Sequence, residues 1–327
     1  MRAKNVTFEP VGLNNRTDQV DMLPVELTVA QNVDLRRGKS ARRRKGGTQV
    51  LAGKFYSFWD NDSTAYVGRD NAGLFTLNEF LPDFSLRELT TLTSGAPLAL
   101  EQVNAVTAVS NGVDLGFISN DTFITPTAPT AQHMIPTVAG EILTSQNGRL
   151  FIARGNVLYY TVAHDLETMD NRYCRIPMPK NLTMAVGLDG GIWVSYAGVI
   201  AFLQGAGPDE YKFIVKADYS AVKGTAVRTK TSLFLKDQEG EAIIFMTSKG
   251  VCIGTESGQL LPITEDQISA GIGQSGAGLV REQNGYVHYL GAVQDPDSAV
   301  NSYVPKAIDI DAWRATNVLH LLTSSQP

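Results

Sequence analysis

Residues 146–160 read Gln-Asn-Gly-Arg-Leu-Phe-Ile-Ala-Arg-Gly-Asn-Val-Leu-Tyr-Tyr, and this stretch decides the fold. Asn147-Gly148 and Gly155-Asn156 are turn dipeptides, because glycine and, to a lesser degree, asparagine tolerate positive φ. The Val, Ile, Leu, Phe and Tyr residues around them suit a half-buried pleated strand. The stretch therefore predicts a hairpin whose strands are joined by tight turns.

The same turn-and-strand pattern occurs five more times along the chain. Most copies are separated by roughly 35 to 45 residues, which is the spacing of propeller blades. The longer gap between the fourth and fifth copies indicates an insertion, an irregular blade or a hidden seventh blade. The glycines that mark the six copies are Gly73, Gly112, Gly148, Gly190, Gly250 and Gly285. We predict an all-β fold, a β-propeller of about six blades within a range of roughly five to seven.

The composition agrees with one packed all-β unit. The chain has 327 residues, of which 43% are hydrophobic and 19% charged, with 30 Gly and 14 Pro, and such chains often form a single barrel or propeller. The net charge of −5 does not indicate nucleic acid as the main partner. No stretch approaches the roughly 18 apolar residues of a membrane span, and the start of the chain lacks a signal-peptide core. We therefore expect synthesis in a host cytoplasm and no membrane span.

The metal- and thiol-bearing residues are sparse. Cys174 and Cys252 both lie in apolar, strand-like runs, which favours buried free thiols over a disulfide. The four histidines are scattered without metal-ligand spacing. Asp60-Asn61-Asp62 and Asp295-Pro296-Asp297-Ser298 offer oxygen ligands but lack the full calcium-loop pattern. We predict no metal site and no cofactor.

The first 50 residues lack the hairpin rhythm and contain a strong basic run. Seven of the ten residues from 36 to 45 are Lys or Arg, which creates a local positive field suited to an acidic partner surface. A solvated loop is the alternative interpretation. We predict an extended basic N-terminal arm (1–50), a β-propeller (51–313) and a C-terminal tail (314–327). The candidate contact residues are Arg36, Arg37, Arg42, Arg43, Arg44 and Lys45.

Several short motifs together resemble a known family. The chain opens with Gly12-Leu13-Asn14-Asn15, continues with Ala30-Gln31-Asn32-Val33-Asp34, and then enters the Arg-rich segment. This opening resembles that of tailed-bacteriophage virion proteins of the β-propeller type. Similar blade motifs follow over most of residues 11–311, and they are Ala105–Gly112, Gly148–Tyr160, Lys223–Ala226 and Gly250–Gly254 with Leu261–Asp266.

The resemblance implies a structural protein of a phage tail, at the head–tail junction, the nozzle or the tail tip. Its partners would be other virion tail proteins and copies of itself, in a homo-oligomer or a ring-shaped complex. The basic arm would then be an inter-subunit contact, and the protein would be located in the virion tail.

Two alternatives involve glycans. A receptor- or glycan-binding propeller at the tail tip would use the rim aromatics Tyr173, Tyr196, Tyr211 and Tyr303. A glycan-cleaving enzyme would need paired carboxylates, and the unpaired candidates are Asp165, Glu167, Asp209, Glu210, Asp237 and Glu239.

No nucleophile elbow or P-loop motif is present, and Gly271–Gly276 has a G-x-G-x-x-G form without a following helix. We predict a non-enzymatic protein.

Overall fold

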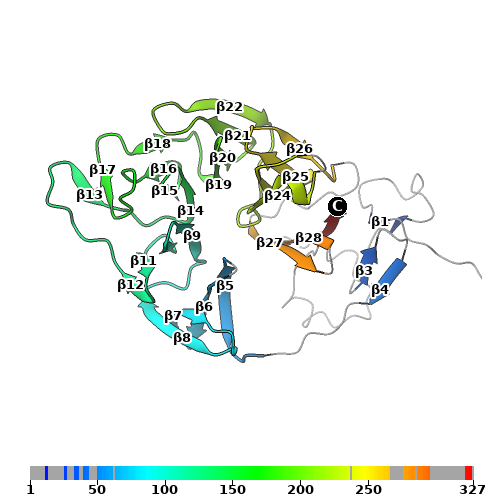
Figure 1. Cartoon of the computed structure of the whole chain (residues 1–327), viewed down its shortest axis with the longest axis horizontal. Coiled ribbons are helices and arrows are strands. Elements are labelled where there is room, and N and C mark those ends of the chain that lie inside the picture. Colours follow the sequence, from blue (N-terminus) through cyan, green and yellow to red (C-terminus); the bar gives the residue numbers. More distant parts are fainter. Residues whose placement is uncertain are drawn as a thin grey trace, which may run out of the picture. The chain divides into compact units, whose positions relative to one another are not determined.

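The regular structure of the described residues is almost entirely β-strand (Figure 1). The chain divides into two compact units. The computed structural model describes residues 50–61, 63–235, 238–265, 275–283 and 286–294, together with the backbone of a few strands outside these ranges. Unit 1 comprises Met1–Gly46 and Lys216–Pro327, and unit 2 comprises Gly47–Val215.

Unit 2 contains four consecutive four-stranded antiparallel sheets. The first sheet consists of β5 (Lys54–Asp60), β6 (Ala65–Asn71), β7 (Leu74–Phe80) and β8 (Leu86–Leu92). The second consists of β9 (Ala99–Val103), β10 (Val106–Ser110), β11 (Leu115–Ser119) and β12 (Thr122–Ile124). The third consists of β14 (Ile142–Gln146), β15 (Arg149–Arg154), β16 (Val157–Tyr160) and β18 (Arg175–Pro177). The fourth consists of β19 (Leu182–Leu188), β20 (Gly191–Tyr196), β21 (Val199–Gln204) and β22 (Lys212–Ala217), which ends at the unit boundary.

Unit 1 contains one further four-stranded sheet, a three-stranded sheet and two short strand pairs. The fifth sheet consists of β23 (Val227–Lys230), β24 (Glu241–Thr247), β25 (Gly250–Thr255) and β26 (Leu260–Pro262), with the 3-10 turn η1 (Thr231–Leu233) between the first two strands. The sixth consists of β27 (Ser275–Gln283), β28 (Tyr286–Gln294) and β29 (Leu321–Ser325). The short pairs are parallel β1 (Gly12–Leu13) with β2 (Glu26–Leu27), and antiparallel β3 (Val33–Arg36) with β4 (Ser40–Arg43).

The predicted β-propeller fold is confirmed by these successive meander sheets, each a blade in which neighbouring strands pair in chain order. Each of the six turn motifs found in the sequence falls in its own sheet. The long gap between Gly190 and Gly250 holds η1 and strands β20 to β24, and these strands all belong to the fourth and fifth sheets, so its described residues form no additional sheet.

The turn chemistry explains why these residues form hairpins. Asn147 and Gly148 have φ values of 47° and 71°, so both central residues adopt the left-handed conformation of a type I′ turn. Gly73, Gly112 and Gly250 likewise have positive φ. At the fourth motif the positive φ belongs to Gly191 rather than to the marked Gly190, and Gly285 lies outside the described residues.

The inner strands β9, β14 and β19 lie next to one another and join consecutive sheets of unit 2. The Ser145 hydroxyl donates to Glu101 on β9, and the Gly187 amide on β19 donates to the Thr144 hydroxyl at 2.7 Å. A Cβ atom at Gly187 would lie 2.2 Å from the Ser145 carbonyl oxygen. Glycine is therefore required at 187 for the close approach of β14 and β19.

Several segments contain more regular structure than the sequence indicated. The Pro/Thr-rich connector contains β13 (Met134–Pro136), which pairs only with β17 (Thr168–Asp170) in a two-stranded ribbon. A proline is tolerated there because the ribbon has no central strand. The N-terminal segment, expected to be extended and without hairpins, contains the β3–β4 hairpin. The predicted C-terminal tail supplies β29.

Candidate functional site

The β3–β4 hairpin contains three of the six basic residues that we proposed as an inter-subunit contact. Arg36 ends β3 opposite Ser40, whereas Arg42 and Arg43 lie on β4 opposite Asp34 and Val33. The hairpin therefore gathers three of the six candidates within two short paired strands. Arg37, Arg44 and Lys45 lie outside the described residues.

An exposed aromatic cluster lies on the first sheet, and we call Phe58, Phe80 and Phe84 the aromatic patch. The ring of Phe80 contacts both others edge to face, with centroids 5.9 Å from Phe58 and 6.0 Å from Phe84. Phe58 is 60% exposed and Phe84 is 52% exposed. Large aromatic side chains exposed together on a surface are typical of protein-binding sites.

A β-bulge sets the position of Phe58. Ser57 has a φ of 56°, and the β5–β6 register shifts between Tyr56 and Phe58. The Ser57 hydroxyl accepts a hydrogen bond at 2.7 Å from the Leu98 amide, which fixes the bulged residue. The bulge changes which side chains of β5 point to each face, so that Phe58 shares a face with Phe80.

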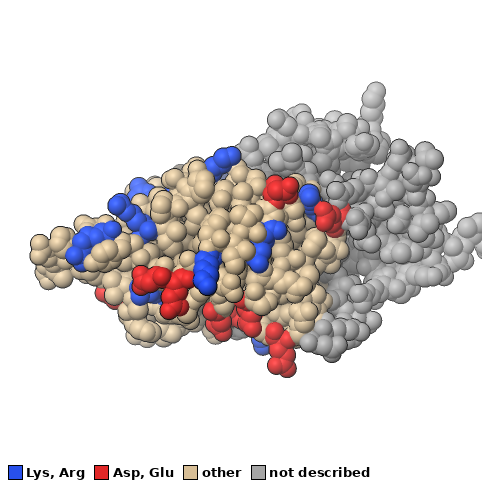
Figure 2. Space-filling view, turned by 90° about the horizontal axis from the view of Figure 1, so that it is seen from above, with Lys and Arg blue, Asp and Glu red and all other residues tan. Residues whose placement is uncertain are grey.

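The charged side chains on the face seen in Figure 2 do not form a single-sign field. Figure 2 shows acidic and basic residues interspersed on a mostly uncharged face. Specific uncharged features are therefore the better candidates for recognition on this part of the chain.

A polar hollow of about 200 Å³ lies between the first and second sheets, and we call it the first–second cleft. Its walls come from the β5–β6 loop and from the ends of the strands of the second sheet. The lining residues are Asn61, Ser63, Thr64, Tyr66, Gln102, Ala105, Thr107, Ile118, Asn120 and Asp121.

Internal hydrogen bonds hold the loop side of the cleft. The side-chain oxygen Oδ1 of Asn61 accepts hydrogen bonds from the backbone amides and the hydroxyls of Ser63 and Thr64, at 2.8 to 3.2 Å. The side-chain nitrogen Nδ2 of Asn61 donates a hydrogen bond to the side-chain oxygen of Gln102 on β9, at 2.6 Å. Asn61, which the sequence offered as a calcium ligand, thus fixes a turn and joins two sheets. Asp62 lies outside the described residues.

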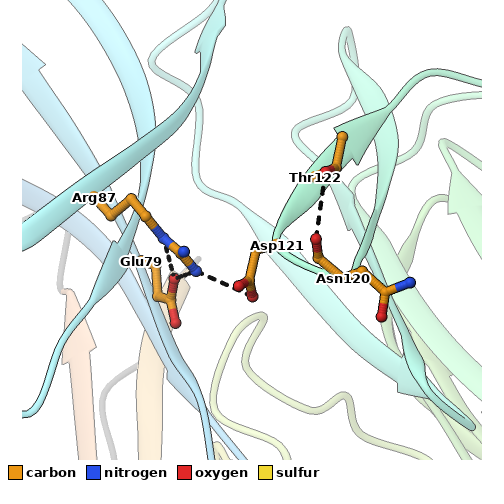
Figure 3. A network of polar contacts seen from close by, with 5 residues as sticks. All are labelled: Glu79, Arg87, Asn120, Asp121 and Thr122. Carbon is orange, nitrogen blue, oxygen red and sulfur yellow. Dashed lines mark hydrogen bonds and ion pairs between the residues drawn. The ribbon is translucent and has the colours of Figure 1, made fainter.

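An ion network includes Asp121, one of the residues that line the cleft (Figure 3). Arg87 on β8 binds the carboxylate of Glu79 on β7, and its guanidinium lies 3.0 Å from the carboxylate of Asp121. Glu79 is only 8% exposed, so its charge depends on this pairing. Hydrogen bonds to both carboxylates raise the pKa of Arg87.

The turn between β11 and β12 directs two neighbouring side chains in different directions. Asn120 and Asp121 have φ values of 46° and 61°, as a type I′ turn requires. Figure 3 shows the Asp121 carboxylate directed toward Arg87 and the Asn120 side chain directed away from the ion network. Asn120 is exposed and lines the cleft.

A second hollow, of about 380 Å³, lies at the outer strands of the third and fourth sheets and is mainly apolar. Two of the predicted glycan-binding tyrosines, Tyr196 and Tyr211, line it. Tyr196 is buried, and the Tyr211 hydroxyl donates to Gln146. Tyr173 is instead exposed beside the guanidinium of Arg172, and Tyr303 lies outside the described residues.

The candidate carboxylates in the third sheet have structural contacts. Asp165 accepts hydrogen bonds from the Glu167 amide and the Thr168 hydroxyl. Hydrogen bonds from Arg172 lower the pKa of Asp170 to about 2. Among the described residues, no group of three or more His, Cys, Asp and Glu side chains is placed to hold a metal ion. Asp237 lies outside these residues.

Cys174 and Cys252 are both free and buried, as predicted. Burial raises the pKa of each thiol, so the thiolate is disfavoured at neutral pH. In the part of the chain that the structure describes, no helix has the length and apolar character to cross a membrane.

No protein-family model and no curated protein matches the chain. Solved structures similar to it include the WD40 β-propeller domain of Doa1, at 9% identity over 75% of this chain and 79% of that chain, with a TM-score of 0.44. The N-terminal domain of Nup159 matches at 12% identity over 72% and 73%, with a TM-score of 0.46. The extracellular domain of BT4673 from B. thetaiotaomicron matches at 12% identity with a TM-score of 0.46, over 77% of this chain and one third (33%) of that longer one.

Proposed function

We propose that this protein is a non-enzymatic structural protein of a bacteriophage tail, located at the head–tail junction, nozzle or tail tip. It assembles with neighbouring tail proteins and with copies of itself. The sequence resemblance over residues 11–311 supports the virion location. The aromatic patch is the observation that carries the assembly role.

The patch supports assembly because the Phe80 ring already contacts the other two rings, while Phe58 and Phe84 remain more than half exposed. Binding a partner would remove this aromatic surface from water without first ordering flexible side chains. Aromatic residues are enriched among those that dominate protein-interface energies. The basic segment adds a positive field that attracts an acidic surface on a neighbouring subunit.

The patch can be tested with the double variant Phe58→Ser/Phe84→Ser, measured by its incorporation into phage particles. We expect incorporation to fall at least about tenfold, because the main apolar contact is lost. Phe213→Ser is the matched control, since Phe213 is 46% exposed on β22, away from the patch. Circular dichroism establishes that all variants remain folded. Normal incorporation of the folded double variant would contradict the assembly role of the patch.

The basic segment needs its own variant, in which Arg36, Arg37, Arg42, Arg43, Arg44 and Lys45 are all replaced by Ser. We expect this variant to fold and to be absent from particles. If particles contain it at the normal level, the proposed electrostatic contact is wrong, whatever the outcome for the aromatic patch.

A receptor- or glycan-binding propeller is the second candidate function. The polar composition of the first–second cleft favours it, since sugars are recognised by side chains that exchange hydrogen bonds with hydroxyl groups.

A further inference from the structure

The first–second cleft lies between two rows of side chains that face each other. On the first sheet, register places Tyr66 between Trp59 and Glu79 on one face. On the second sheet, Thr107 lies between Gln102 and Ile118 on the facing side. Tyr66 and Ile118 belong to one apolar cluster. The cleft therefore begins where this apolar packing ends.

Two hydroxyl-bearing side chains of the cleft are nine-tenths or more buried, and their hydroxyls form no hydrogen bond with the residues that the structure describes. Tyr66 and Thr107 are each 5% exposed and both line the cleft. Neither hydroxyl is among the fully buried side-chain atoms that lack a partner, so both hydroxyls reach solvent through the cleft. A ligand that bonds with both would take the place of water. The Asn120 amide, also without a protein partner among the described residues, adds a donor and an acceptor at the rim.

We propose that the first–second cleft binds one neutral monosaccharide unit, through the hydroxyls of Tyr66 and Thr107 and the amide of Asn120. Sugar hydroxyls suit this set because each donates one hydrogen bond and accepts others, as the two protein hydroxyls do. The inference deepens the second candidate function and does not depend on tail assembly.

The charges around the cleft favour a neutral ligand. Asp121 is the one carboxylate among the lining residues, and it already pairs with Arg87. The other lining residues carry no charge. An acidic sugar would place its carboxylate near Asp121 without a free cation to balance it, which is unfavourable in a partly buried site.

The dimensions favour a single ring. The hollow of about 200 Å³ is smaller than the roughly 300–1,000 Å³ of pockets that enclose drug-sized ligands. It would hold one terminal or side-branch residue of a longer glycan, with the remainder of the glycan in solvent.

The test is an NMR titration of the full chain with D-glucose, D-galactose and D-mannose, and with D-glucuronate as the charged comparison. We expect saturable binding of at least one neutral sugar with a Kd in the millimolar range, where binding free energy is about −4 kcal/mol. Glucuronate should bind more weakly. If none of the three neutral sugars saturates by about 50 mM, or if glucuronate binds best, the proposal is wrong.

Two variants test the location. Tyr66→Phe and Thr107→Val each remove one hydroxyl at nearly constant volume, and each should weaken the sugar by at least about fivefold. Thr130→Val is the matched control, because Thr130 is exposed and lies outside the cleft, and it should leave the affinity unchanged. Because neither hydroxyl bonds to a described residue and both reach solvent, Tyr66→Phe and Thr107→Val should melt close to the wild-type temperature. Unchanged sugar affinity in both folded variants would exclude the cleft.

These outcomes are separable from tail assembly. A chain that loses sugar binding through Thr107→Val should still enter particles normally. Loss of both properties in this variant would overturn the assignment of the cleft to ligand binding alone, because it would make the cleft part of the assembly surface.

Discussion

Unit 2 joins its sheets in two different ways. Between the third and fourth sheets, a continuous apolar cluster includes Phe151, Leu158 and Ile192, and all three are almost completely buried. Between the first and second sheets, the apolar cluster is smaller, and polar contacts such as Arg87–Asp121 and Asn61–Gln102 hold the rim.

The difference shows that sheets with the same strand order can pack against their neighbours through either an apolar or a polar interface, which we call the apolar joint and the polar joint. The apolar joint depends on close packing, which responds little to salt or pH. The polar joint retains charges and hydroxyls at its edge, and therefore leaves room for a ligand. We expect the first kind to provide rigidity and the second to provide recognition.

The largest expected effect is from Phe151→Ala in the apolar joint. Phe151 is 1% exposed and contacts the rings of Tyr160 and Tyr211. Its truncation should lower the free energy of unfolding by about 3–5 kcal/mol, through lost burial and the cavity left behind. Urea denaturation followed by tryptophan fluorescence measures the change. Leu100→Ala in the first–second joint is the comparison, and a larger loss there would invert the contrast between the joints.

The second prediction concerns two glycines. Gly187→Ala should lower stability by about 1–3 kcal/mol, because the new methyl group meets the backbone of β14, with the Ser145 carbonyl oxygen 2.2 Å away. Gly116→Ala meets only the side-chain ring of Phe123, which can turn aside. Thermal unfolding of both variants should therefore show the larger loss at Gly187. An equal loss would indicate that β11 and β12 are as rigidly packed as β14 and β19.

The third prediction concerns the ion network. Arg87→Met leaves the Glu79 carboxylate without its partner in a site where Glu79 is 8% exposed. We expect a loss of stability smaller than that of Gly187→Ala, measured by chemical denaturation. The double variant Glu79→Gln/Arg87→Met should recover most of it, because no unpaired charge remains. A double variant no more stable than Arg87→Met would mean that the methionine itself disturbs packing.

The smallest expected effect is at Asp114, near the first–second joint. Burial alone would raise the pKa of Asp114, but hydrogen bonds from Thr93 and Asn111 outweigh it and hold the pKa below its usual value. A depressed pKa means that the carboxylate stabilises the fold above its unfolded pKa of about 3.9, and that this contribution is lost as the pH falls through the lower folded value.

Asp114→Asn should therefore lower stability at neutral pH by less than about 1 kcal/mol, after allowance for solvent screening. The difference from wild type should shrink below pH about 4. Denaturation midpoints measured from neutral to acidic pH give this difference directly. A gap that widens in acid would mean that the pKa of Asp114 is raised in the folded protein.

The fold could be predicted from local sequence because turn chemistry is local. Asn147-Gly148 requires positive φ at both positions, and the structure has it. Short strands such as β13 and β17 escaped prediction because they are stabilised by each other across 32 residues rather than by their own pattern. The β3–β4 hairpin was missed because its basic residues obscured the apolar alternation of Val33 and Leu35.

The candidate cleft could not be predicted from the sequence. Its walls come from residues 61–66 and from residues 102–121, which become neighbours only when the first and second sheets pack together. The single local signal was Asn120-Asp121, a dipeptide that favours a turn. Which of its two side chains would pair with Arg87 depends on the three-dimensional arrangement shown in Figure 3.

The two cysteines of the chain fall one in each unit, Cys174 in unit 2 and Cys252 in unit 1, and both are buried without a disulfide. Alkylating reagents reach such thiols only when the surrounding structure opens. Each cysteine therefore reports the opening of its own unit. Peptide mass spectrometry can measure the alkylation rates of the two cysteines separately, and equal or different rates would reveal whether the two units open together or in sequence.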